Sequence, residues 1–416
     1  MSSDKPLPIT KQMVWQAYKL VERNGKAAGV DGQSLDDFAK NLHNNLYKLW
    51  NRMASGSYFP PPVLHVEIPK ASGGVRPLGI PTVADRVAQM VVKQVLEPDL
   101  EPVFDPDSYG YRPGKSAHQA VEAAHKRCWE RDWVVDLDIK SFFDCIDHEL
   151  LTRAIHCHTQ ERWVLLYLQR WLEAPVQWPD GTLQHRLKGT PQGGVISPLL
   201  ANLFLHYAFD VWMRRNYPSI PFERYADDAI CHCRTQREAE ELKAALEVRC
   251  AQCHLQLHPQ KTQIVYCKDS NRRADHPLIQ FTFLGFAFRP RKAKNRWGKI
   301  FTSFQPAVSP QALKRMRARI RGWRLRQHAP LSLEDVARSL NPVLRGWWQY
   351  YGRFYPAEMW DKLFRYFDER LGAWLRQKCK PLRGHRGRSL RKLNQMAQQH
   401  PGYFVHWQVL GHATVG

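Results

Sequence analysis

The pattern of apolar and polar residues predicts both strands and helices along this chain. Residues 63–70 (VLHVEIPK) follow a turn-rich stretch and alternate as a half-buried strand does. A helix is expected over residues 11–24, and another follows the prolines of RPLGIP (76–81) and runs to about residue 96. Both kinds of element are therefore expected in the first third of the chain.

A basic amphipathic helix is predicted over residues 311–327. Leu313, Met316, Ile320 and Trp323 recur at helical spacing and define one apolar face. Much of the remaining surface is cationic, with Lys314, Arg315, Arg317, Arg319, Arg321, Arg324 and Arg326. The pattern SLED, which begins at Ser332, is typical of the start of a further helix.

Two groups of aspartates stand in strand-like segments. Residues 222–233 are predicted to form two short strands joined by a tip that carries Asp227 and Asp228. In VVDLDIKSFFD, the period of two places Asp136 and Asp138 on one face of a strand. A third carboxylate beside the tip would create a site for a hard divalent cation such as Mg²⁺. Adjacent aspartates also occur at exposed turns, so the spacing alone leaves both interpretations open.

The charge of the chain is concentrated near its C-terminus. The 416 residues, enough for about two or three domains, carry a formal net charge of +22. Residues 290–416 hold 26 Lys and Arg against 6 Asp and Glu, whereas the preceding residues are almost neutral. This excess favours a nucleic-acid partner over a merely solvated basic surface, with an anionic membrane as a weaker alternative.

Other features of the composition indicate an intracellular protein. No apolar run approaches the length of a membrane span, and the N-terminal residues lack the pattern of an export signal. The nine cysteines fit a reducing compartment. The sequences CHC (231–233) and CAQCH (250–254) could suggest zinc or haem, but small buried thiols are the favoured interpretation.

Several motifs, in order and spacing, resemble those of the reverse transcriptases encoded by group II introns. They are RPLGIPTVADRVAQ (76–89), SYGYRPGKSAHQA (108–120), VVDLDIKSFFDCIDH (134–148), GTPQGGVISPLLANLFL (189–205), YADD (225–228), LQLHPQKT (255–262) and FLGF (283–286). The resemblance covers nearly the whole chain. It implies an α+β right-hand polymerase with fingers, a palm with an antiparallel sheet, and a thumb, followed by an all-α basic maturase segment.

The resemblance also implies a catalytic set. Asp138, Asp227 and Asp228 match the carboxylates that bind two Mg²⁺ ions, with Mn²⁺ as a possible substitute, whereas Asp136 matches no ligand position. Two such ions, about 4 Å apart, stabilise the attacking and leaving oxygens of a phosphoryl transfer. Lys261 resembles a lysine proposed to protonate the leaving pyrophosphate, although a lysine that stabilises a helix end is an equal alternative.

Four further residues match substrate-binding positions of the family. Lys70 and Arg76 flank ASGGV, where the family holds the triphosphate, although two cations beside glycines also suit an ordinary exposed turn. Phe143 matches an aromatic wall that excludes the 2′-OH of a ribonucleotide; the alternative is a core phenylalanine, which we expect of Phe142. Gln192 in TPQGG matches a residue that contacts the incoming nucleotide.

The expected organisation has three parts: an N-terminal helical extension (1–55), reverse transcriptase fingers and palm (56–300), and a thumb and maturase region (301–416). In the last part Lys314, Arg315, Arg317, Arg321 and Arg324 are expected to bind RNA. The implied partners are group II intron RNA, an RNA template with a DNA primer, target DNA and deoxynucleoside triphosphates, but no membrane. The expected location is the bacterial cytoplasm, in association with the nucleoid or a ribonucleoprotein.

Two other functions remain open from the sequence. One is a related bacterial reverse transcriptase recruited to defence or another cellular role. The other is an RNA-binding splicing factor without polymerase activity, against which the complete set of three aspartates argues. Many relatives carry a C-terminal endonuclease with paired C-x-x-C ligands, and no such pattern is present here, so we expect no second-strand nuclease.

Overall fold

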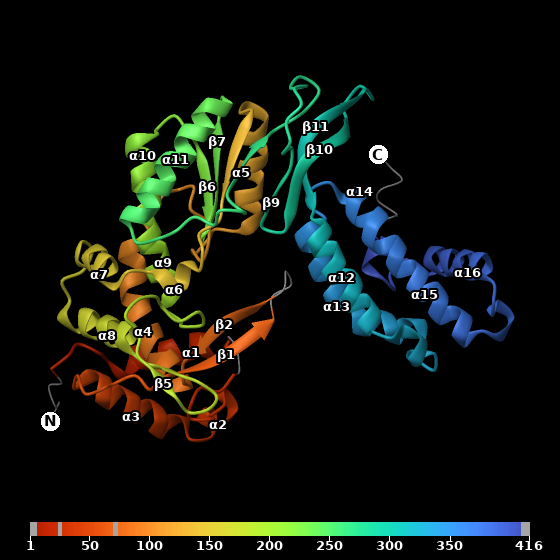
Figure 1. Ribbon diagram of the computed structural model, residues 1–416. Coiled ribbons are helices and arrows are strands. Elements are labelled where there is room, and N and C mark those ends of the chain that lie inside the picture. The colour runs from red at the N-terminus through yellow and green to blue at the C-terminus, as the bar shows by residue number, and fades with distance from the viewer. Residues whose placement is uncertain (1–5, 24–26, 70–73, 409–416) are drawn as a thin grey trace. The chain divides into compact units, whose positions relative to one another are not determined.

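The computed structural model describes residues 6–23, 27–69 and 74–408, and the chain divides into two compact units. Unit 1 comprises Met1–Ala120 and Trp133–Ile264, and unit 2 comprises Val121–Asp132 and Val265–Gly416. Each unit contains helices and strands (Figure 1). None of the described helices combines the length and apolar character that crossing a membrane requires.

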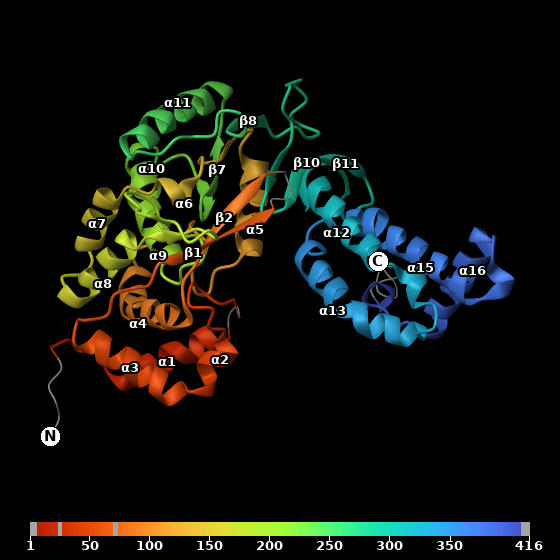
Figure 2. The ribbon, with the colours of Figure 1, turned by 60° about the horizontal axis from the view of Figure 1, so that its bottom comes forward.

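The helices of unit 1 begin with a group formed by the N-terminal segment. Figure 2 shows α1, α2 and α3 gathered beside α4, and α1 packs on both α3 and α4. Thr10 and Thr82 accept hydrogen bonds from the third residue of α1 and of α4, which fixes where these two helices begin. The helices are α1 (Lys11–Glu22), α2 (Leu35–Lys40), α3 (Leu42–Ala54), α4 (Val83–Leu100), α6 (Phe142–Cys145), α7 (His148–His156), α8 (Arg162–Glu173), α9 (Ser197–Leu205), the π-helix η1 (His206–Asp210), α10 (Val211–Asn216) and α11 (Gln236–Gln252).

Two four-stranded sheets have all or most of their strands in unit 1. One has the order β2-β1-β4-β5, in which β1 and β2 form an antiparallel hairpin. The other has the order β6-β7-β3-β8, in which β7 is antiparallel to both β6 and β3. The strands are β1 (Val63–Pro69), β2 (Val75–Ile80), β3 (Trp133–Leu137), β4 (Val176–Gln177), β5 (Leu183–Gln184), β6 (Phe222–Tyr225), β7 (Asp228–Cys233) and β8 (Gln263–Tyr266).

Unit 2 combines a short antiparallel sheet, of order β11-β10-β9, with a set of helices. Helix α5 (Ala117–Glu130) has most of its residues in this unit. The other elements are β9 (Phe281–Phe283), β10 (Phe286–Lys294), β11 (Ile300–Val308), α12 (Pro310–Gly322), the 3₁₀ helix η2 (Leu325–His328), α13 (Leu333–Tyr351), α14 (Pro356–Met359), the π-helix η3 (Trp360–Phe364), α15 (Arg365–Lys378), the 3₁₀ helix η4 (Lys380–Leu382) and α16 (Arg386–Gln399).

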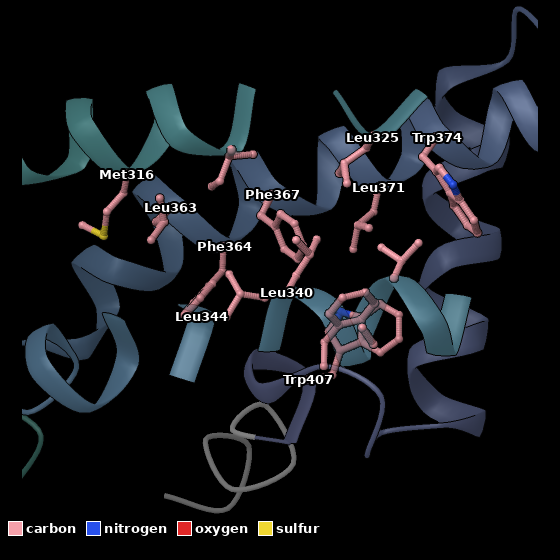
Figure 3. Close-up of a cluster of buried hydrophobic side chains, with 14 of the residues drawn as sticks. Met316, Leu325, Leu340, Leu344, Leu363, Phe364, Phe367, Leu371, Trp374 and Trp407 are labelled. Carbon is pink, nitrogen blue, oxygen red and sulfur yellow. The ribbon is translucent and has the colours of Figure 1, made fainter. Parts of the chain in front are cut away.

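The core of unit 2 lies between α12, α13 and α15. Phe364 and Phe367 point toward Leu340 and Leu344 of α13, and Met316 of α12 lies at the edge of the same cluster (Figure 3). Leu344, Phe364 and Phe367 are completely buried. The predicted apolar face of the basic helix is confirmed, because its first three members belong to this core and its fourth packs against it.

Most predicted elements are confirmed, with shifts at their ends. The strand over 63–70, the hairpin over 222–233 and the helix that begins after Ser332 are present. The expected basic helix over 311–327 is shorter than predicted, because it ends at Gly322 and Arg324 then adopts a left-handed conformation with φ of 45°. A 3₁₀ turn follows, so the end of the expected helix is a separate element.

Candidate active site

The candidate active site is built around the tip of the β6–β7 hairpin. Tyr225 pairs with Asp228, which leaves Ala226 and Asp227 as the turn, and Ala226 has a left-handed φ of 56°. Strand β3 pairs with β7 so that Leu137 faces Ala229. Because Asp138 directly follows β3, this register places it beside the acidic turn. The structure thus brings the three predicted aspartates to one end of the sheet.

Burial, together with carboxylates that lie near one another at the turn, shifts the pKa values of Asp227 and Asp228. The side chain of Asp228 reaches solvent, but the surrounding protein desolvates much of it. This burial and the charges of Asp227 and Asp138 raise the pKa of Asp228 to about 7. The pKa of Asp227 is also raised, by burial first and by Asp138 second. Positive charge placed among these groups would therefore be stabilising.

Two of the predicted cations lie within electrostatic reach of the turn. Lys261 donates a hydrogen bond from Nζ to Oδ2 of Asp138 over 3.0 Å, and its charge lowers the pKa of Asp228. Arg76, exposed on β2, lowers the pKa of both Asp227 and Asp228. Lys70 lies outside the described residues. Strand β2, which is expected to belong to the fingers, therefore contributes positive charge to the same site as the aspartates.

A buried ion pair supports the acidic turn from behind. Arg224 of β6 donates to both carboxylate oxygens of Asp210, over 2.7 and 2.6 Å, and both residues are buried. The same guanidinium donates to the carbonyl oxygen of Ala226 and to Asn202, each over 3.0 Å. Because Arg224 is anchored by a bidentate pair, its bond to Ala226 fixes the turn backbone. Sequence reasoning missed this network, although Arg224 directly precedes YADD.

A glycine in SYGYRPG makes a close backbone approach to the turn. A side chain at Gly110 would place its Cβ only 2.3 Å from the backbone nitrogen of Ala226. Asn202 donates to the carbonyl oxygen of Gly110 over 2.6 Å and so links this loop to the Arg224 network. The SYGYRPG and YADD motifs, distant in sequence, therefore pack directly on each other.

The loop that carries Gln192 is held against strand β2. The backbone nitrogen of Gly79 donates to the carbonyl oxygen of Gln192 over 2.9 Å. Gly193 follows with φ of 132°, and a Cβ there would come within 2.5 Å of the carbonyl oxygen of Gly79. Only glycine permits this approach between the loop and the strand.

A second buried polar network lies beneath the same loop. Gln89 of α4 accepts hydrogen bonds from the backbone nitrogens of Val195 and Ile196, over 2.7 and 3.3 Å, and donates to Asp85 over 2.9 Å. Tyr58 also donates to Asp85, which is 1% exposed. Burial raises the pKa of Asp85 to about 6. Both residues belong to the motif ADRVAQ, to which sequence reasoning assigned no role.

The two adjacent phenylalanines differ as expected. Phe142 is 2% exposed and packs against Phe204, whereas Phe143 is only half-buried. The carbonyl oxygen of Phe143 accepts a hydrogen bond from the backbone nitrogen of Thr190, in the loop that leads to Gln192, over 2.8 Å. The assignment of Phe142 to the core is confirmed, and the exposed edge of Phe143 leaves its predicted role open to test.

Asp136 differs in environment from the three predicted ligands. Gln263 donates to its carboxylate over 3.1 Å, and burial is the main cause that raises its pKa to about 7. The charges of Asp228 and Asp138 contribute to the same shift. Asp136 is therefore close to the site but engaged with a partner of its own.

The basic helix α12 presents most of its predicted cations to solvent. Lys314, Arg315 and Arg321 of α12 are exposed, as is Arg324, which lies just beyond the end of the helix. The expectation that the whole basic face is exposed is wrong at Arg317. This side chain is half-buried and donates from Nε to the carbonyl oxygen of Lys362 over 2.8 Å. The ring of Tyr366 lies 5.4 Å from the same guanidinium. A role in holding α12 to η3 therefore competes with RNA binding at Arg317.

The structure supports the interpretation of the cysteines in CHC (231–233) and CAQCH (250–254) as small buried thiols. Cys231, Cys233, Cys250 and Cys253 are all buried. Burial raises the pKa of Cys250 to about 12, which disfavours the thiolate that a metal would require.

The fit of the acidic turn to a metal rests on its donor chemistry. Carboxylate oxygens are the ligands that Mg²⁺ prefers, and the charge of Asp138 raises the pKa of both Asp227 and Asp228. Over the residues that the structure describes, no three His, Cys, Asp or Glu side chains converge closely enough to enclose an ion by themselves. The aspartates thus offer the ligands of an open site, of the kind that Mg²⁺ completes with water and substrate phosphates.

Comparison with known families decides the class of this chain. Residues 68–288, more than half of its length, match the family described as reverse transcriptase (RNA-dependent DNA polymerase). The chain belongs to the reverse transcriptase family. Residues 313–393 match the maturase-specific domain of group II introns. This matched segment of the chain includes α13, α15 and most of α12. The resemblance drawn from the motifs is therefore confirmed.

Individual relatives agree with this assignment. Protein YkfC of Escherichia coli is 30% identical over 302 residues, which cover 63% of this chain and 78% of that protein. The group II intron-encoded protein LtrA of Lactococcus lactis is 37% identical over 201 residues, 48% of this chain and 33% of LtrA. An uncharacterized 91 kDa protein in the cob intron of Schizosaccharomyces pombe is 32% identical over 209 residues, 49% of this chain and 25% of that protein. The chain thus matches only a third or less of the two intron proteins.

Proposed function

We propose that this reverse transcriptase is an RNA-directed DNA polymerase of a group II intron that also binds the intron RNA and assists its splicing and mobility. The observation that carries the polymerase proposal is the position of Asp138, Asp227 and Asp228 at the same end of the sheet, beside the β6–β7 turn, with Arg76 and Lys261 within electrostatic reach. The match to a maturase-specific domain, on a segment rich in exposed cations, supports the role in splicing.

The proposed chemistry assigns a task to each group. Asp138, Asp227 and Asp228 would hold two Mg²⁺ ions, which when bound supply charge stabilisation for the attacking and leaving oxygens of a phosphoryl transfer. Arg76, and Lys70 by resemblance, bind the triphosphate of the incoming deoxynucleotide. Phe143 restricts the space beside its sugar, and Gln192 contacts the nucleotide from the loop on β2.

Lys261 is assigned a proton-transfer role in this proposal. Its ammonium group pairs with Asp138, so the proton it carries lies at the edge of the acidic site. An ammonium group at this place can donate a proton to a leaving pyrophosphate oxygen. The hydrogen bond from Lys261 to Asp138 supports this role over that of a lysine that stabilises a helix end.

The test uses Asp227→Asn and Asp228→Asn, which remove charge but keep the side-chain shape. We expect primer extension on an RNA template to fall by orders of magnitude, because lost transition-state stabilisation of this kind amounts to several kcal/mol. Binding of the cognate intron RNA is expected to stay within a few fold. Extension by Asp227→Asn at the parent rate would contradict the polymerase assignment. A splicing rate of the intron that does not rise when the parent protein is added would contradict the maturase role.

A further inference from the structure

A cavity of about 340 Å³ adjoins the loop that carries Gln192. Its walls come from β2, at Pro77–Gly79, and from the segment between Gln184 and Gln192, all within unit 1. This volume lies in the range of sites that accept a nucleotide-sized group. Gln192 itself borders the cavity, so a ligand there would lie next to the proposed nucleotide contact.

Three side chains that line this cavity carry buried polar atoms without a hydrogen-bond partner. They are His65 at Nε2, Thr190 at Oγ1 and Arg186 at Nη1. Thr190 is 3% exposed and His65 is 9% exposed. The carboxylate of Glu67 lies 3.8 Å from His65 Nε2, which is too far for a hydrogen bond. Buried polar atoms are nearly always satisfied in folded proteins, so three unmet atoms around one cavity indicate a ligand.

His65 and the backbone at Thr190 are held in place before any ligand binds. The ring of His65 stacks on Trp178, with ring centroids 3.9 Å apart. Thr190 is fixed through its backbone bond to Phe143, and the preceding Gly189 accepts a hydrogen bond from His148 over 2.8 Å. A site whose polar atoms are already positioned loses little entropy on binding.

The chemistry of the lining selects the ligand. Arg186 and Lys188 supply two positive charges and Asp144 one negative charge. The remaining positive charge suits a phosphodiester. A threonine hydroxyl and an imidazole nitrogen can each donate or accept, according to the proton position. Their natural counterpart is a ligand hydroxyl that both donates and accepts, and the 2′-OH of a ribonucleotide has this property.

We propose that this cavity binds a ribonucleotide of the template strand, with its 2′-OH at Thr190 and His65 and its phosphate at Arg186 and Lys188. The inference rests on the proposed polymerase function. The template base pairs with the incoming nucleotide, and Gln192, the proposed contact of that nucleotide, borders the cavity. The cavity would make RNA a better template than DNA of the same sequence.

The test compares RNA and DNA templates of identical sequence with the same DNA primer. Thr190→Val replaces the hydroxyl with a methyl group, and His65→Phe keeps the stack on Trp178 but removes Nε2. Each should lower the ratio of kcat/KM on RNA to kcat/KM on DNA by roughly three- to tenfold, the value of one lost hydrogen bond. Arg186→Gln should lower kcat/KM on both templates alike, because both strands carry phosphates.

The matched control is Thr152→Val, which removes an exposed hydroxyl on α7 outside the cavity and should leave the ratio at the parent value. Equal losses on the two templates in Thr190→Val and His65→Phe would overturn the proposal, because they would show a purely structural role. A parent enzyme that extends neither template would contradict the polymerase function itself, which distinguishes the two failures.

Discussion

Neighbouring residues fix the backbone beneath Asp227 and Asp228. Arg224 donates to the carbonyl oxygen of Ala226 while it is anchored by Asp210, and Gly110 lets a second loop pack on the same turn. An ion pair buried in this way is weak evidence for added stability, but it specifies one arrangement of the groups above it. The residues behind the turn therefore serve the geometry of the carboxylates.

Sugar selectivity is predicted to depend on Phe143. Phe143→Ala should open space beside the sugar of the incoming nucleotide, so ribonucleotide incorporation should rise relative to deoxyribonucleotide incorporation. The half-buried ring and its intact backbone bond to Thr190 indicate that the loop itself will stay in place. Competition between the two nucleotides on one primer-template measures the effect. Reduced activity with an unchanged sugar preference would show that Phe143 only fills the core.

A pH-dependent contribution to stability is predicted for Asp85. Its pKa rises from 3.8 to about 6 on folding, so its ionised form is disfavoured in the native state. The stabilising effect is complete below about pH 4 and is lost as the pH rises through 6, a change of about 3 kcal/mol for two pKa units. Relative to the parent protein, Asp85→Asn should therefore gain this amount in unfolding free energy between pH 4 and pH 7.

Urea unfolding across this pH range measures the difference. Asp99→Asn removes an exposed carboxylate from the same helix and controls for the loss of charge. Parallel stability curves for the parent and Asp85→Asn would contradict the assigned pKa shift.

At the scale of elements, the predictable features were those determined by short stretches of sequence. The β6–β7 hairpin and the capped start of α13 depend on neighbouring residues, and both are present. The bond from Arg317 to Lys362 joins α12 to a helix 45 residues later in the sequence. The link from Gln89 to Val195 joins residues 106 positions apart. No local pattern could reveal these long-range contacts.

The exposed face of α12 is predicted to contribute electrostatically to RNA binding. Replacing Lys314 and Arg321 of α12, together with Arg324 just beyond its end, with Gln should remove contacts to phosphates and flatten the plot of log affinity against log salt by about two units in total, at roughly 0.7 to 0.9 units for each contact. These positions lie off the buried stripe, so the fold should persist. Arg317→Gln is the matched control, because its side chain holds the carbonyl of Lys362 and its loss should reduce stability more than the salt slope.

Binding of the cognate intron RNA from low to moderate salt measures this slope. Splicing and extension of a short primer-template are assayed in parallel, and splicing should weaken first. An identical salt slope in the parent and the triple variant would remove α12 from the RNA surface.

At the scale of the whole molecule, the two proposed activities fall on parts of the chain with different charge. The aspartates lie in the nearly neutral first two-thirds, and the cations are concentrated in residues 290–416. A polymerase site must accept metal ions and a triphosphate, whereas a broad basic surface suits the shape and phosphates of a large folded RNA. Loss of one function without the other is therefore the expected result of well-placed substitutions.

The most direct test of the account compares Asp138→Asn with Asp136→Asn. Both residues lie near the acidic turn and both substitutions remove one carboxylate, but only Asp138 is assigned as a metal ligand. We predict that Asp138→Asn lowers the rate of primer extension by orders of magnitude at every Mg²⁺ concentration tested. Asp136→Asn, whose partner Gln263 can still hydrogen-bond to it, should stay within a few fold of the parent. Equal losses in the two variants, or full activity in Asp138→Asn, would contradict the proposed metal site.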